Sequence, residues 1–126
     1  MKILAVDDER DVQTLFEQRF RKEIKNGELE FAFANSGNEA IDYLNDHSHE
    51  EIFILSDINM PGMSGLELLE KIKKEFENPS PVVMMMTAYG DEYNYNQATR
   101  LGADDLLTKP VDFKLLKEKL KERMAN

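Results

Sequence analysis

The sequence contains no cysteine, which excludes disulfides, thiolate catalysis and cysteine-ligated zinc or iron–sulfur sites. It also lacks any apolar run near the ~20 residues of a membrane span, and Asp7 and Asp8 come too early for a secretory signal. Basic residues are also fewer than acidic ones: 16 Lys and Arg against 25 Asp and Glu give a net charge of −9. Such a charge opposes binding to nucleic acid, which depends on counterion release by basic groups. We therefore expect a cytoplasmic protein with no membrane or direct nucleic-acid partner. Any metal ion that it binds should be a hard cation.

The composition is that of one folded domain. A chain of 126 residues with 41% apolar and 33% charged residues can bury roughly two-thirds of its unfolded surface and remain soluble. There is no internal repeat, low-complexity segment or linker. We expect a single domain over residues 1–126.

Five apolar runs alternate with segments of helical period. The first, third and fourth runs are continuous, as in strands covered on both faces, whereas the second alternates as in a half-exposed edge strand. The runs are 2–6, 29–33, 52–55, 82–86 and 104–108. Strand–helix units of about 25 residues suit right-handed crossovers and a parallel sheet. The sequence therefore predicts a doubly wound α/β fold with a five-stranded parallel sheet of order 2-1-3-4-5.

The helical segments differ in quality. One stripe joins Val12, Leu15, Phe16, Phe20 and Ile24 in a single helix. Ser-x-x-Glu capping boxes begin two others, at residues 36–39 and 64–67. The segment 91–101 has a poor apolar stripe, and we expect it to be the mobile element.

The last helix carries a basic side. Lys114, Lys117 and Lys121 lie away from its apolar stripe, and residues 111–123 sum to +2 while the rest of the chain sums to −11. This side is either a solvated face or part of a partner-binding surface.

Polar side chains follow four of the five predicted strands. Asp7 and Asp8 follow the first, Asp57 the third, Thr87 the fourth and Lys109 the fifth. Because the carboxyl ends of parallel strands meet at one edge of a sheet, these groups should share a crevice. Clustered carboxylates favour a divalent cation such as Mg²⁺, and an ammonium and a hydroxyl opposite suit a phosphoryl group. Asp57 is then the natural nucleophile.

Each of these features alone also has a purely structural interpretation. An Asp pair after a strand often begins a helix, and a hydroxyl there commonly bonds to the backbone. Their combination in this order is what indicates a phosphoryl site.

The motifs that contain these residues resemble those of a known family, the response regulator receiver domains of two-component signalling, typified by the single-domain chemotaxis regulator. The resemblance extends from Lys2 to about Met124. It rests on Ile3-Leu4-Ala5-Val6-Asp7-Asp8-Glu9, Asp57-Ile58-Asn59-Met60-Pro61-Gly62-Met63-Ser64-Gly65, Met86-Thr87-Ala88, Gly102-Ala103-Asp104-Asp105 and Lys109-Pro110.

This resemblance implies a flavodoxin-like receiver fold and a phosphorylation-controlled signalling function. Asp57 would accept a phosphoryl group from a sensor histidine kinase or phosphotransfer protein, and Thr87 and Lys109 would bind its oxygens. Asp7, Asp8, Asp57 and the carbonyl of Asn59 would hold Mg²⁺. The domain would catalyse only its own phosphorylation and dephosphorylation. Its partners would be a downstream effector or a fused output domain, with a possible homodimer through the last helix region, and Lys109-Pro110 would be cis.

Three positions bear on how the signal is relayed or how long it lasts. Leu106 stands where the family usually has a switch aromatic, so a relay from Thr87 to an aromatic ring in its usual form is in doubt. Asn59 and Tyr89 occupy positions that tune phosphoryl lifetime in the family, although Tyr89 has an equally good interpretation as a loop aromatic. His47 and His49 should be solvent-exposed and should not bind metal.

Two other functions remain open. A Mg²⁺-dependent phosphatase of the haloacid-dehalogenase type also uses a strand-end aspartate, with an acid two residues on; Glu9 fits that position formally, but the chain is short for the usual cap. A degenerate receiver that binds partners without phosphorylation is disfavoured, because all five site positions are present.

Overall fold

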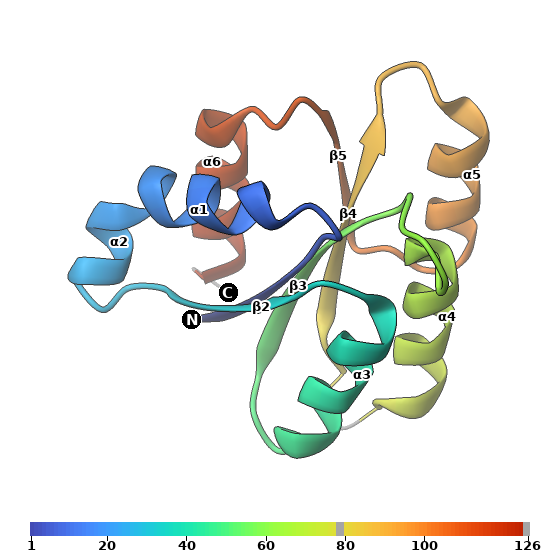
Figure 1. Ribbon diagram of the computed structural model, residues 1–126, viewed down its shortest axis with the longest axis horizontal. Helices are drawn as coiled ribbons and strands as arrows, with labels where there is room; N and C mark the ends of the chain where they lie inside the picture. Colours follow the sequence, from blue (N-terminus) through green and yellow to red (C-terminus); the bar gives the residue numbers. More distant parts are fainter. Residues whose placement is uncertain (78–79, 125–126) are drawn as a thin grey trace.

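The computed structural model describes residues 1–77 and 80–124. Strands and helices alternate along the chain, as Figure 1 shows. Their bounds are β1 (Lys2–Val6), α1 (Arg10–Arg19), α2 (Arg21–Lys25), β2 (Glu30–Ala34), α3 (Gly37–Asp46), β3 (Ile52–Asp57), α4 (Gly65–Glu75), β4 (Val82–Ala88), α5 (Glu92–Arg100), β5 (Asp105–Lys109) and α6 (Phe113–Met124).

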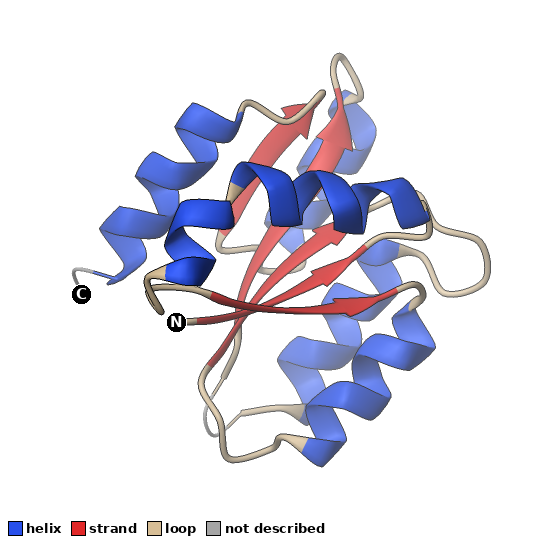
Figure 2. Ribbon diagram, turned by 60° about the vertical axis from the view of Figure 1, so that its left-hand side comes forward, coloured by secondary structure: helices blue, strands red, loops and turns tan. Residues whose placement is uncertain are grey.

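The strands form one parallel sheet in the order β2-β1-β3-β4-β5. Helices α1 and α6 cover one face of the sheet, and α3, α4 and α5 cover the other (Figures 1 and 2). The predicted flavodoxin-like doubly wound fold and its strand order are therefore confirmed. None of the described helices is long and apolar enough to span a bilayer.

Each face of the sheet has its own apolar core. Between the sheet and α3–α5, aliphatic side chains such as Ile54, Leu69 and Ile72 are fully buried. On the α1–α6 side the core is aromatic: the rings of Phe16 and Phe113 meet edge to face with centroids 5.4 Å apart. These two cores hold the sheet rigid beneath its carboxyl edge, where the polar groups lie.

Strands β3 and β4 extend further than the apolar runs predicted. β3 continues through Ser56 to Asp57, and β4 through Thr87 to Ala88. The polar residues at these ends are as buried as the apolar ones before them. The rigid ladder therefore positions Asp57 and Thr87 directly, without an intervening loop.

The serine half of both predicted capping boxes is confirmed. The backbone N–H of Glu39 donates to Ser36 Oγ at 3.1 Å, and that of Glu67 donates to Ser64 Oγ at 3.2 Å. Helix α5 fits the expectation of weak packing, because Ala98 is its buried residue. Few apolar contacts hold such a helix in place.

The single helix predicted over residues 12–24 is wrong in two respects. The chain leaves helical geometry at Phe20 (φ −107°, ψ 17°), which separates α1 from α2. Leu15 and Ile24, expected on the buried stripe, are 40% and 36% exposed. Phe20 itself is fully buried. The change of chain direction at Phe20 takes Ile24, in the following helical turn, out of line with the buried side of α1.

His47 is also less exposed than predicted. Its ring stacks on Tyr43 with centroids 4.0 Å apart, and its Nδ1 lies 2.8 Å from the Tyr43 carbonyl oxygen. His49 is exposed as expected. The potential metal cluster found among the described residues contains neither histidine.

The prediction that Lys117 lies on the side of the last helix away from its apolar stripe is wrong. Lys117 Nζ is 3.1 Å from Glu23 Oε2 and lies over the Phe20 ring, so it ties α6 to α2. Lys114 and Lys121 are exposed as expected. Burial alone would raise the pKa of Glu23, but hydrogen bonds from its own backbone N–H and from Lys117 outweigh this and hold the pKa below its usual value.

Glu23→Gln should lower the free energy of unfolding by about 0.5 kcal/mol at pH 7, a small loss because Lys117 is partly exposed. The folded pKa of Glu23 is depressed, so this contribution is present above the unfolded pKa and disappears as the pH falls through the folded one. Urea unfolding from pH 7 to pH 4 measures it, with the exposed Glu17→Gln as control. A loss that grows as the pH falls would contradict the ion pair.

Candidate functional site

The carboxyl edge of the sheet brings three carboxylates together. Oxygen atoms of Asp7, Asp8 and Asp57 all lie within 4.8 Å of one another. Asp7 and Asp57 are buried, with 5% and 6% of their surface exposed, whereas Asp8 is exposed. The hard oxygen donors and the exposed member that leaves room for water fit Mg²⁺.

Lys109, from the end of β5, bridges the two buried carboxylates. Its Nζ donates to Asp57 Oδ2 at 2.9 Å and to Asp7 Oδ2 at 3.2 Å. The Lys109–Pro110 peptide bond is cis, as the resemblance implied. Contacts over 52 and 102 residues of sequence thus place the ammonium beside Asp57.

Backbone groups complete the surroundings of the acids. The N–H of Glu9 donates to Asp7 Oδ1 at 3.0 Å, and that of Asn59 approaches Asp57 Oδ1 at 3.4 Å. The carbonyl of Asn59 as a metal ligand stays a prediction. Tyr89, two residues after Thr87, is 87% exposed.

Burial raises the pKa of Asp57; Lys109 opposes the shift through its hydrogen bond and charge, and the charge of Asp7 adds to it. For Lys109, burial lowers the pKa, but the hydrogen bond and charge of Asp57, with Asp7, outweigh it and the net direction is upward. The lysine therefore stays protonated beside a carboxylate whose charge is poorly solvated. A cation or a transferred group that accepts electron density would relieve that carboxylate.

Thr87 is the least satisfied polar group of this edge. It is 1% exposed, and its Oγ1 has no hydrogen-bond partner among the described residues. A buried hydroxyl normally has a partner, so one without it calls for an explanation. Thr87 lies in β4 next to the end of β3, where its hydroxyl can donate a hydrogen bond to an oxygen of an incoming group.

Gly65 is a site residue that the sequence analysis missed. Its N–H donates to the Ile58 carbonyl at 2.7 Å, and a Cβ there would collide with the Asp57 carbonyl oxygen and lie 2.6 Å from Ile58 Cα. The signal in the sequence was its place in the motif after Asp57, where Gly65 was interpreted as part of the family resemblance and of a helix start, without a role in the site.

Comparison with known proteins agrees with this geometry. The profile of the family described as response regulator receiver domain matches residues 3–121. Among solved structures, a response regulator receiver domain protein from Clostridium thermocellum is 27% identical with a TM-score of 0.82, covering 96% of this chain and 91% of that one.

Two further structures share the fold. The Vibrio cholerae chemotaxis protein CheY4 is 24% identical with a TM-score of 0.79, covering 96% of both chains. The signal receiver domain of an HD domain-containing protein from Pseudomonas fluorescens Pf-5 is 24% identical with a TM-score of 0.81, covering 96% of this chain and 84% of that one. With a family profile matched over nearly its whole length, the chain belongs to the response regulator receiver domains of two-component systems.

Proposed function

We propose that this domain receives a phosphoryl group on Asp57 from a phosphohistidine of a sensor histidine kinase or phosphotransfer protein. The observation that carries the proposal is the convergence on Asp57 of a lysine ammonium at 2.9 Å and two further carboxylates, near a buried hydroxyl that has no partner in the described part of the chain. Membership of a family of signalling modules favours this function over that of a phosphatase with steady turnover.

In the transfer, a carboxylate oxygen of Asp57 attacks phosphorus; the P–O bond forms as the P–N bond breaks, and the histidine ring leaves. Charge on the phosphoryl oxygens spreads during the reaction and must be met by fixed donors. Lys109 donates from β5 and Thr87 from β4. Because both are held by strands, they need little rearrangement.

We infer that Asp7, Asp8 and Asp57, with the Asn59 carbonyl, hold Mg²⁺. The all-oxygen donor set fits this ion, which, when bound, neutralises negative charge between the carboxylates and the phosphoryl oxygens. The domain then catalyses only its own phosphorylation and dephosphorylation.

Intact-mass spectrometry after incubation with Mg²⁺ and acetyl phosphate tests the function. We expect the mass of one HPO₃ group to be added to the chain, and chelation of Mg²⁺ with EDTA to prevent it. Continuous release of phosphate from simple monoesters, without a mass increase, would instead indicate a phosphatase.

Asp8→Asn should weaken Mg²⁺ binding at least about tenfold, which is about 1.4 kcal/mol, because it removes a charge from a cluster whose affinity depends on ligand charge. The fold should persist, since Asp8 is exposed. Isothermal titration with MgCl₂ measures the change. Asp11→Asn, an exposed acid in the first turn of α1, should bind like the parent; equal affinities in all three proteins would refute the metal assignment.

We propose that phosphorylation is read at the face formed by α5, β5 and α6, by an effector or an output domain, with homodimerisation as a further possible outcome. Helix α5 buries little apolar surface, so alternative positions of it differ modestly in energy. Leu106 is partly buried against the core on the α3–α5 side of the sheet and has no hydroxyl, which favours a graded shift over a two-position lock.

Amide hydrogen exchange with and without beryllofluoride, an acyl-phosphate mimic, tests this output face. Protection should change between residues 88 and 121. Changes confined to α1, α2 and α3 would place the output elsewhere.

A further inference from the structure

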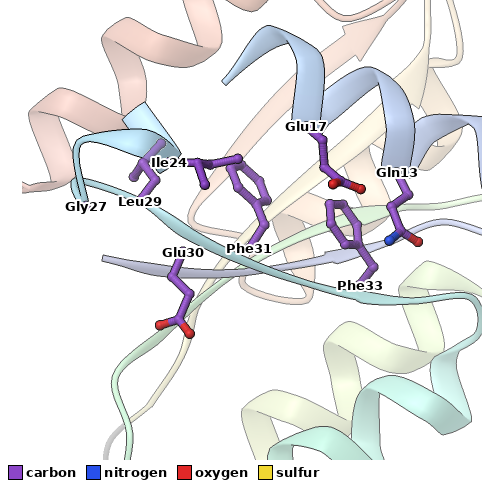
Figure 3. Close-up of a pocket in the computed structure, with 8 residues that line it drawn as sticks. All are labelled: Gln13, Glu17, Ile24, Gly27, Leu29, Glu30, Phe31 and Phe33. Carbon is purple, nitrogen blue, oxygen red and sulfur yellow. The ribbon is translucent and has the colours of Figure 1, made fainter. Parts of the chain in front are cut away.

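A groove of about 540 Å³ lies between helices α1 and α2 and the edge strand β2, and none of the proposed phosphoryl or metal residues lines it (Figure 3). Its apolar lining comes from Phe31, Phe33 and Ile24. The rings of Phe31 and Phe33 stack with centroids 5.8 Å apart. Both are partly exposed, and Ile24 is 36% exposed. This part of the aromatic core is therefore open at the margin of the sheet.

The same strand has a free backbone edge. β2 is the outermost strand and, over residues 1–77 and 80–124, pairs only with β1. It runs along the front of the sheet between α1 and α3 (Figure 2). The N–H of Glu30 and the carbonyl of Ala34 bond toward β1, at 2.9 and 3.1 Å. Because the backbone groups of successive residues alternate in direction, those of Phe31 and Phe33 point outward. A second strand could add to this edge.

Two carboxylates flank the groove. Glu17 points from α1 toward Phe33, and Glu30 projects from the opposite side of β2 (Figure 3). Neither has an ion-pair partner in the described part of the chain. With a net charge of −9 on the whole chain, the charge complement of this surface is basic.

We propose that this groove binds an extended basic segment of a partner protein, which adds a strand to the free edge of β2. An apolar side chain of the segment packs against Phe31 and Phe33, and the Lys or Arg side chains that alternate with it point to the other face of the sheet, where Glu30 lies. Glu17, on the apolar side, adds to the negative charge that attracts the segment. The surface is separate from the phosphorylated aspartate and from the α5–α6 face, so the inference does not depend on the proposed function.

The backbone groups at the edge of β2 favour an occupant in extended conformation. Unpaired N–H and C=O groups on an edge strand favour strand addition, in which main-chain bonds provide affinity and alternate side chains provide specificity. A second copy of this chain, which itself carries a net charge of −9, is a less suitable occupant than a basic segment. Like charges across an interface oppose association.

The probe is a capped peptide, Lys-Val-Arg-Val-Lys-Val-Arg, titrated into the ¹⁵N-labelled chain while amide shifts are followed by NMR. We expect saturable binding with the largest shifts over residues 13–33. The double variant Glu17→Lys/Glu30→Lys should weaken binding at least about tenfold. The matched double variant Glu92→Lys/Glu118→Lys, which changes two exposed acids outside the groove, should weaken it much less.

Two further peptides separate the possible causes of binding. The same peptide with alternate backbone amides N-methylated cannot complete the strand ladder and should lose most affinity, and a version with Glu for each basic residue should not bind. Equal weakening by both double variants, or undiminished binding of the methylated peptide, would overturn the proposal. So would the absence of saturable binding, or shifts at β2 that depend on protein concentration without peptide, which would indicate a second copy.

Discussion

Asp57→Asn should take up no phosphate from acetyl phosphate in the presence of Mg²⁺, whereas the parent gains one HPO₃ group. The side-chain amide of the Asp57→Asn variant cannot form the acyl phosphate. Among the described carboxylates, Asp57 is the one that lies 2.9 Å from the Lys109 ammonium and close to two further acids. Lys109→Ala and Thr87→Ala should still react, but roughly 10²–10³ times more slowly, as is typical when a transition-state donor is removed. Intact mass followed over time measures all four proteins.

Ser56→Ala is the matched control, since Ser56 adjoins Asp57 but uses its hydroxyl on the Asp57 carbonyl at 3.0 Å; its phosphate uptake should stay near that of the parent. The assignment is refuted if Asp57→Asn still gains phosphate that peptide mapping places on Ser56, Ser64 or Thr87. If the Asp57→Asn variant instead carries phosphate on Asp7 or Asp8, Asp57 is not the unique nucleophile.

Gly65→Ala should lower the free energy of unfolding by about 3 kcal/mol or more and impair phosphate uptake. A methyl group there meets the backbone of Asp57 and Ile58, and Met85 Cε at 2.8 Å. The methionine can move, but the two backbone groups are the last residue of β3 and the residue directly after it. Relief of the collision therefore displaces the segment that orients Asp57, and the effect should appear in both urea unfolding and the rate of the mass increase.

Gly62→Ala separates crowding from backbone strain. Gly62 lies three residues earlier, in the loop before α4; it has φ +74° and would meet nothing within 4 Å of an added Cβ. Alanine there costs about 1–2 kcal/mol for the left-handed conformation alone. If Gly65→Ala proves no more destabilising than Gly62→Ala, the close approach of Gly65 to Asp57 does not control the site.

The sequence by itself determined the fold class, the strand order and the identity of the polar strand-end residues. Continuous apolar runs indicate strands buried on both faces, and alternating runs indicate half-exposed edge strands. In a parallel sheet the carboxyl ends of all strands lie at the same edge. Asp57 and Lys109 could therefore be placed at one edge without coordinates. Both capping boxes were equally predictable, because Ser36 and Ser64 act on backbone groups three residues away.

Only the tertiary structure decided which of these groups touch and which lack a partner. The bridge from Lys109 to both acids, the Thr87 hydroxyl that no described residue bonds and the crowding at Gly65 depend on atoms from several strands packed within a few ångströms. The break at Phe20 and the Glu23–Lys117 pair follow from how α1, α2 and α6 share one core. Side-chain direction and long-range packing, which no local pattern encodes, are set only when the elements assemble.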